Sequence, residues 1–198
     1  FPVPYLFVAG NHDSRPNRAA IKATPGVIPL HNTSYDVGEG DDRVRIAGFD
    51  DPLITTTEDV PRAEREQVEL DATPRLNALI EREHPDVLAI HNPVILQKVV
   101  GMVPLALGGH QHQAKLGARS GTLISLAGST GATGLGSLLV DADLPASASL
   151  LRFRGGVLVS IDDLEAVGTS GDLAIRRHTI TAADREADNA DFIGRDAD

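Results

Sequence analysis

Side chains that can bind a metal ion or carry a proton follow three separate apolar stretches of the sequence. Asn11, His12 and Asp13 come just after the apolar run 3–9, His91 follows the run 86–90, and His110 and His112 follow Leu107 and two glycines. Apolar runs of this length are typical of buried strands, and open α/β sheets carry their sites just beyond the carboxyl ends of such strands. We therefore expect these side chains to meet at one edge of a sheet.

The pair His110 and His112, spaced by one residue, is typical of a metal-binding loop. Gly108 and Gly109 precede it and allow a tight turn, and imidazole nitrogens are common metal ligands. The chain has no Cys, which excludes disulfides and thiolate ligands. A metal site must therefore use His, Asp, Asn or Glu, a set that suits Mn, Fe, Zn, Ni or Mg.

The elements that would position these residues alternate between strand and helix. Helices are predicted at 16–24, 94–100 and in a stretch that starts after an N-cap at Asp59 and ends at Glu83, where Pro74 is expected to separate two helices. Strands are predicted at 3–9, 27–30, 34–37, 44–49, 86–90, 122–127 and 173–180, with a hairpin of 150–153 and 157–161 around Gly155 and Gly156. The pattern indicates a mixed α/β chain.

Composition narrows the class of protein. The 198 residues carry a net charge of -10, which argues against a general nucleic-acid-binding surface. No run of 18 apolar residues exists that would cross a membrane. Residues 182–198 carry six acids against two arginines and are expected to form a disordered, solvated tail after a domain portion at 1–181. Location stays open between a soluble cytoplasmic domain and one attached to an upstream segment.

In their order along the chain, these elements resemble the motif series of the calcineurin-like metallophosphoesterase superfamily. That series runs D-x-H, G-D-x-x-D or N, G-N-H-D or E, a lone His, and G-H-x-H. Gly10 to Asp13 match the third element, His91 matches the lone His, and Gly109 to His112 match the last. The resemblance implies an α/β fold with a two-sheet sandwich flanked by helices, incomplete at its N-terminus.

The resemblance also implies a ligand set. Asn11, His91 and His110 would ligate the second metal of a pair, and His112 would ligate the first. Two divalent cations roughly 3.5–4 Å apart would then clamp a phosphate-ester substrate and supply a bridging hydroxide.

Two further residues gain catalytic roles from the same resemblance. His12 would contact the phosphate or protonate the leaving oxygen. Asp13 would orient His12, as carboxylates commonly do for an active imidazole.

The first two motifs of the series would lie upstream of Gly10, where this chain has only nine residues. Without their carboxylates the first metal keeps only His112. We therefore expect hydrolysis of a phosphomonoester or phosphodiester by a longer chain that includes an N-terminal segment of the same protein, and little activity from these 198 residues alone.

Two other functions fit the same residues. One is a non-catalytic binding or scaffold protein on this fold, a reading that the His12 and Asp13 pair disfavours. The other is a module that binds a single metal through Asn11, His91, His110 and His112.

Plain structural roles also compete for individual residues. Asn11 to Asp13 alone would be an ordinary strand-end turn, and His91 alone would be a satisfied core histidine; together with the paired histidines they favour a site. The remaining candidates have no partner motif and are expected at the surface or in turns: His31, His84, His178, Asp50 and Asp51.

Overall fold

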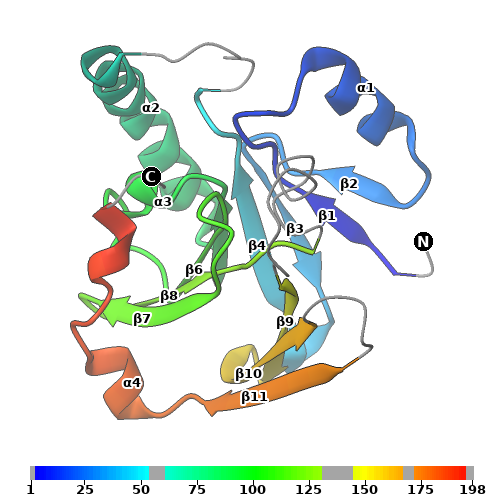
Figure 1. Ribbon diagram of the computed structural model, residues 1–198, viewed down its shortest axis with the longest axis vertical. Helices are drawn as coiled ribbons and strands as arrows, with labels where there is room; N and C mark the ends of the chain where they lie inside the picture. The colour runs from blue at the N-terminus through cyan, green and yellow to red at the C-terminus, as the bar shows by residue number, and fades with distance from the viewer. Residues whose placement is uncertain (1–2, 54–60, 131–144, 167–171, 195–198) are drawn as a thin grey trace.

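The computed structural model describes residues 3–53, 61–130, 145–166 and 172–194 (Figure 1). Its strands are β1 (Tyr5–Phe7), β2 (Val27–Pro29), β3 (Thr33–Val37), β4 (Val44–Phe49), β5 (Val87–Ile90), β6 (Leu105–Gly108), β7 (Lys115–Arg119), β8 (Thr122–Leu126), β9 (Ala146–Arg154), β10 (Val157–Ala166) and β11 (Leu173–Thr179). Its helices are α1 (Arg15–Ala23), α2 (Arg62–Glu83), α3 (Pro93–Leu96) and α4 (Ala182–Glu186), with 3-10 turns η1 (Gly40–Asp42) and η3 (Asp191–Gly194).

A six-stranded sheet in the order β3-β4-β5-β6-β8-β7 forms the centre of the molecule. Strands β4, β5, β6 and β8 run parallel, and the antiparallel strands β3 and β7 lie at its edges. The parallel strands are the near-continuous apolar runs of the sequence, as expected for strands covered on both faces. Their carboxyl ends share one edge, so the residues that follow β5 and β6 are brought close together.

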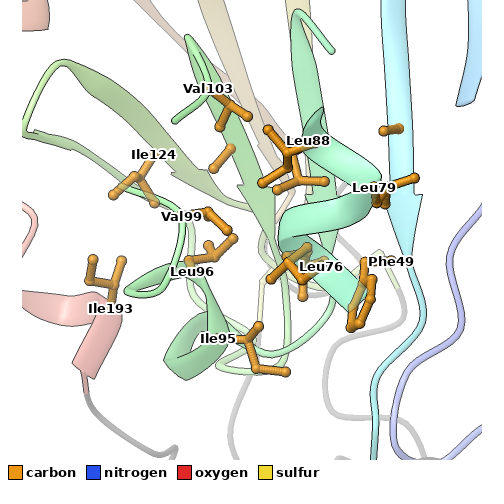
Figure 2. Close-up of a cluster of buried hydrophobic side chains, with 14 of the residues drawn as sticks. Phe49, Leu76, Leu79, Leu88, Ile95, Leu96, Val99, Val103, Ile124 and Ile193 are labelled. Atoms are coloured by element: carbon orange, nitrogen blue, oxygen red, sulfur yellow. The ribbon is translucent and has the colours of Figure 1, made fainter. Parts of the chain in front are cut away.

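Each face of this sheet has its own hydrophobic cluster. On one face, Val87 and Leu123 pack with Leu158 and Ile161 of β10, which belongs to a three-stranded sheet in the order β11-β10-β9. On the other face, the alternate strand residues pack under α2 and α3, as Figure 2 shows for Leu88 with Leu76, Leu79 and Leu96. The predicted α/β class with two facing sheets and helices is confirmed.

Helix α2 is continuous through Pro74, so the predicted division into two helices is wrong. Proline removes one backbone donor and leaves the carbonyl four residues earlier without its helical partner. Here that carbonyl belongs to Leu70, and both Pro74 and Leu70 are exposed, so water can satisfy it. The predicted N-cap, Asp59, lies outside the described residues.

The C-terminal residues 182–194 are ordered and partly buried, so the predicted solvated tail is wrong over this range. Helix α4 begins with a capping box of Thr181 and Asp184. Beyond it, Ala190 and Ile193 are fully buried in the cluster beneath the helices. The described acids of this segment are exposed, whereas Ala190 and Ile193 reach the core, which a count of charges cannot reveal.

Strands β1 and β2 form a separate parallel pair. The end of β1 is nevertheless fixed to the end of β4 in the central sheet. The Asp51 N–H donates to the Ala9 carbonyl at 3.0 Å, and the Ala9 N–H donates to the Asp50 carboxylate at 3.3 Å. This link places the loop that starts at Gly10 beside the site edge of the central sheet. Within the described part of the chain, no helix is both long and apolar enough to cross a bilayer.

Candidate metal centre

Three of the predicted ligands meet at the site edge, each from a different loop. The Asn11 side-chain oxygen, Oδ1, lies 3.0 Å from Nε2 of His91, and Nδ1 of His110 lies 3.2 Å from the same His91 atom. The two rings are nearly perpendicular, with centroids 5.1 Å apart. The loops after β1, β5 and β6 thus bring together residues that are 80 and 19 positions apart.

Hydrogen bonding alone leaves this arrangement poorly satisfied. In the neutral ring, the Nε2 atom of His91 is either a donor or an acceptor. It can form one good hydrogen bond, either with Asn11 or with His110. A single N–H or lone pair shared between both partners forms two poorly aligned ones. A cation between the three donor atoms would accept a lone pair from each of them.

The distances between the donor atoms fit such a cation. Ligand atoms about 2.0–2.1 Å from a zinc ion are roughly 3.3 Å apart in a tetrahedral site and roughly 2.9 Å apart in an octahedral one. The observed 3.0 Å and 3.2 Å fall between these values. The donors are nitrogen and oxygen atoms of the kind that Zn, Mn and Fe accept.

The surroundings of His91 keep its ring neutral. Burial lowers the pKa of His91 to about 4, and the neighbouring positive charge of His110 adds to this effect against the opposing charge of Asp13. A neutral imidazole has a free lone pair for a metal. The ring is therefore ready to bind a cation at neutral pH without first losing a proton.

The loop after β6 has a strained backbone. His110 and His112 have φ angles of 67° and 55°, in the left-handed region that non-glycine residues rarely adopt. Such strain is concentrated at functional sites. The left-handed conformation is adopted by the two histidines and not by the glycines before them. Gly108 is needed for packing instead, since a Cβ there would lie only 2.5 Å from the Leu126 side chain.

Of the other predicted residues, His12 and His112 lie near the cluster and are exposed. The charges of both influence the pKa of His91. Their exposure leaves them open to a substrate or to a second cation. Asn92, next to His91, instead caps α3 through the Val94 N–H at 2.9 Å.

Asp13 shapes the loop that carries Asn11 and His12. Its carboxylate accepts a hydrogen bond from the Gly10 N–H at 2.7 Å and closes the turn of residues 10–13. In the described residues no hydrogen bond joins Asp13 to His12. The Asp13 carboxylate thus has two effects. It closes the turn of residues 10–13, and its charge acts on the pKa of His91.

Asp51, which was expected in a turn, lies buried at the end of β4 within electrostatic reach of His12. It is 1% exposed, its Oδ1 accepts from the Leu53 N–H at 2.9 Å, and its Oδ2 has no hydrogen-bond partner among the described residues. Burial raises the pKa of Asp51 to about 6, while the charge of His12 opposes the shift. Its position after Gly48-Phe49 at a strand end was the available signal, but such carboxylates are common in turns.

The histidines expected outside the site are outside this cluster. His31 contacts Asp50 at 2.7 Å, His178 contacts Asp163 at 3.3 Å, and His84 ends α2 in the left-handed conformation. In the described segments, no group of three or more His, Asp or Glu side chains forms a metal site by itself. The centre described above therefore depends on the amide oxygen of Asn11 as its third donor.

Comparisons with known proteins find similarity in the course of the backbone and none in the sequence families. No protein-family model matches the sequence, and no curated protein matches it. Among solved structures, Vps29 complexed with Zn²⁺ from Entamoeba histolytica is 14% identical, with a TM-score of 0.38 over 90% of this chain and 83% of its own. Vps29 from Cryptosporidium parvum is 18% identical, with a TM-score of 0.41 over 89% and 69% of the two chains.

A further similar structure is a putative 5'-nucleotidase from Staphylococcus aureus, solved in complex with alpha-ketoglutarate. It is 12% identical, with a TM-score of 0.39 over 92% of this chain and 40% of its own. Likenesses at this level concern the course of the backbone and carry neither family membership nor activity over to this chain.

Proposed function

We propose that Asn11, His91 and His110 bind one divalent cation, and that this cation belongs to a phosphoester-hydrolysing centre. The observation that supports the proposal is the contact of His91 Nε2 with both Asn11 Oδ1 and His110 Nδ1, at 3.0 Å and 3.2 Å. Three donors from three loops meet around His91 Nε2 at the carboxyl ends of strands, the usual place for a site in an α/β sheet.

A bound cation would polarise a phosphoryl oxygen and stabilise charge that develops on it. The chain's own residues divide the remaining work. Asn11, His91 and His110 would hold the cation, and the exposed His12 would meet the phosphate or protonate the leaving oxygen. Asp51 is buried within electrostatic reach of His12, so its carboxyl group is a candidate for a role in the same centre.

A second cation would find fewer ligands in this chain. Of the residues that match the motif series, only His112 is left for it, and the bridging carboxylates of that series belong to its first two elements, D-x-H and G-D-x-x-D. Two-metal hydrolysis of a phosphomonoester or phosphodiester is therefore the proposed activity of a chain that carries those motifs. For these 198 residues we expect one bound cation and little hydrolysis.

A metal-binding role without catalysis is the second candidate. It is favoured because Asn11, His91 and His110 surround a single position, which suits one cation and not a pair. The two candidates differ in one respect: a non-catalytic module needs Asn11, His91 and His110, but it has no use for His12.

The experiment is a calorimetric titration of the metal-free protein with Zn²⁺ and with Mn²⁺. We expect one site per chain in the native protein and no measurable site in His110→Ala, with His178→Ala as the control because His178 lies on β11 beside Asp163. Absence of binding by the native chain would reject the proposal.

Catalysis is tested separately, with p-nitrophenyl phosphate and bis(p-nitrophenyl) phosphate, on a chain that carries D-x-H and G-D-x-x-D motifs as well as on these 198 residues. Metal-dependent hydrolysis that is lost in His12→Ala, with metal binding retained, supports the hydrolase. Metal binding without hydrolysis of either ester supports the non-catalytic module.

A further inference from the structure

The segment 188–194, here named the C-terminal clamp, returns to the loop that carries the paired histidines. The side chain of Gln111, which lies between His110 and His112, donates to the Phe192 carbonyl at 3.1 Å. Lys115 donates to the Gln111 side-chain oxygen at 2.8 Å and lies over the Phe192 ring at 6.0 Å from its centroid. The backbone of this loop is thus bound to the clamp through its middle residue.

The clamp also reaches the loop that carries His91. Gln97, just beyond α3, donates from its side chain to the Ile193 carbonyl at 3.2 Å. Ile193 is fully buried and belongs to the same hydrophobic cluster as Ile95 and Leu96, all three of which Figure 2 labels. Because α3 starts two residues after His91, the clamp holds this loop through both a hydrogen bond and apolar packing.

The far end of the clamp is fixed to β7. The Asn189 and Ala190 N–H groups both donate to the Ala118 carbonyl, and the Ala118 N–H donates to the Asn189 side chain at 2.9 Å. Gly117 gives room for this contact, since a Cβ there would lie 3.0 Å from both Asn189 and Phe192. The segment is therefore a rigid support rather than a loose chain end.

We propose that the C-terminal clamp is a positioning element of the metal centre, which holds the His91 and His110 loops at the separation that cation binding requires. The inference rests on the metal binding proposed above. It assigns positioning roles to Gln111 and Gln97, which lie next to the ligands and donate to the clamp.

The physical reason is the strain in the histidine loop. His110 and His112 both have positive φ angles, which an unsupported loop would relax. A loop that spends only part of its time in the binding conformation has its affinity reduced in proportion to that fraction. Gln111 joins the two strained residues, so its bond to Phe192 opposes that relaxation.

The test uses two variants, Gln111→Leu and Gln97→Leu, with Gln67→Leu as the matched control. Gln67 makes an ordinary exposed hydrogen bond to Asp71 on α2, at 2.8 Å. We expect Zn²⁺ affinity to fall about tenfold or more in the first two variants, by analogy with the loss of residues that orient metal ligands. The control should keep the native affinity.

A second measurement needs no metal. Hydrogen exchange at residues 109–112 of the metal-free protein should be faster in Gln111→Leu than in the native chain and unchanged in Gln67→Leu. Two variants at different loops keep the test decisive if one of them fails to fold, which circular dichroism would reveal.

The outcomes separate the two proposals. Native binding with unchanged affinity in both Gln111→Leu and Gln97→Leu overturns the clamp and leaves the metal centre intact. Absence of metal binding by the native chain overturns the metal centre and, with it, the clamp's role in positioning ligands, whatever hydrogen exchange shows.

Discussion

His91 and Gly10 lie in contact so close that a Cβ on Gly10 would be 2.9 Å from the His91 ring. The glycine that opens the loop of Asn11 is therefore part of the wall against which the ligand ring of His91 packs. Side chains at real Cβ positions essentially never come this close, so the ring can keep its place only if residue 10 has no side chain.

Gly10→Ala should displace His91. Overpacking of this kind destabilises a protein by about 1–3 kcal/mol, and the ring displacement should also weaken Zn²⁺ binding. The control is Gly109→Ala, whose Cβ would lie 3.5 Å from the same ring, an ordinary contact distance. Urea unfolding and a metal titration measure both effects, and equal behaviour of the two variants would contradict the prediction.

Asp51→Asn should stabilise the fold at neutral pH. The pKa of Asp51 is about 6 in the folded chain and 3.8 in the unfolded chain, so the folded chain binds more protons between these values and its stability falls as pH rises through them. The variant should be more stable above pH 6 by at most roughly 3 kcal/mol and little changed below pH 3.8.

Unfolding at pH 3.5 and pH 7.5 tests this difference, with the exposed Asp41→Asn as control. A stability that does not depend on residue 51 at pH 7.5 would mean that the buried carboxylate is stabilised there by a group outside the described residues. If Asp51→Asn stabilises the fold but slows hydrolysis, Asp51 is a functional carboxylate, since active sites often keep buried charged groups that destabilise the fold.

His91 should make the metal-free protein sensitive to mild acid. Its pKa is about 4 when folded and 6.5 when unfolded, so the unfolded chain binds the extra proton between these values. The free energy of unfolding should therefore fall as pH drops from 6.5 to 4, by roughly 3 kcal/mol at most. His91→Gln should show a flatter profile in the presence of a chelator, and parallel profiles would contradict the pKa shift.

Ile193→Ala should destabilise the protein by about 2–5 kcal/mol, as expected for a truncated core residue. Ile193 is 0% exposed, whereas a residue in a solvated tail would give almost no effect. The exposed Ile175→Ala on β11 is the control, since its side chain is 61% exposed. Chemical denaturation followed by circular dichroism measures both.

The sequence predicted β4, β5 and β8 of the central sheet well because each is a short apolar run that ends in polar or turn residues. Val44–Phe49 and Val87–Ile90 differ from their predicted ranges by at most one residue. It also predicted that Asn11, His91 and His110 would meet, because parallel strands bring their carboxyl ends to one edge.

Other features depend on tertiary contacts that no local pattern carries. Strand β7 was not predicted, because Lys115–Arg119 has little apolar character and forms an edge strand by pairing with β8. The place of Ile193 in the core and the burial of Asp51 likewise follow from packing between distant segments. Pro74 is tolerated inside a helix because the Leu70 carbonyl, which loses its helical partner, faces water. Whether it faces water depends on which side of α2 packs against the sheet.

The separation of Asn11 and His91 by 80 positions has a consequence for the order of folding. Contacts between distant segments form after the intervening chain has been organised, and proteins rich in them fold slowly. The cation centre would then be among the last parts of the molecule to form. In a refolding experiment, the visible absorption of bound Co²⁺ should rise later than the helical circular dichroism signal and so mark the arrival of the native state.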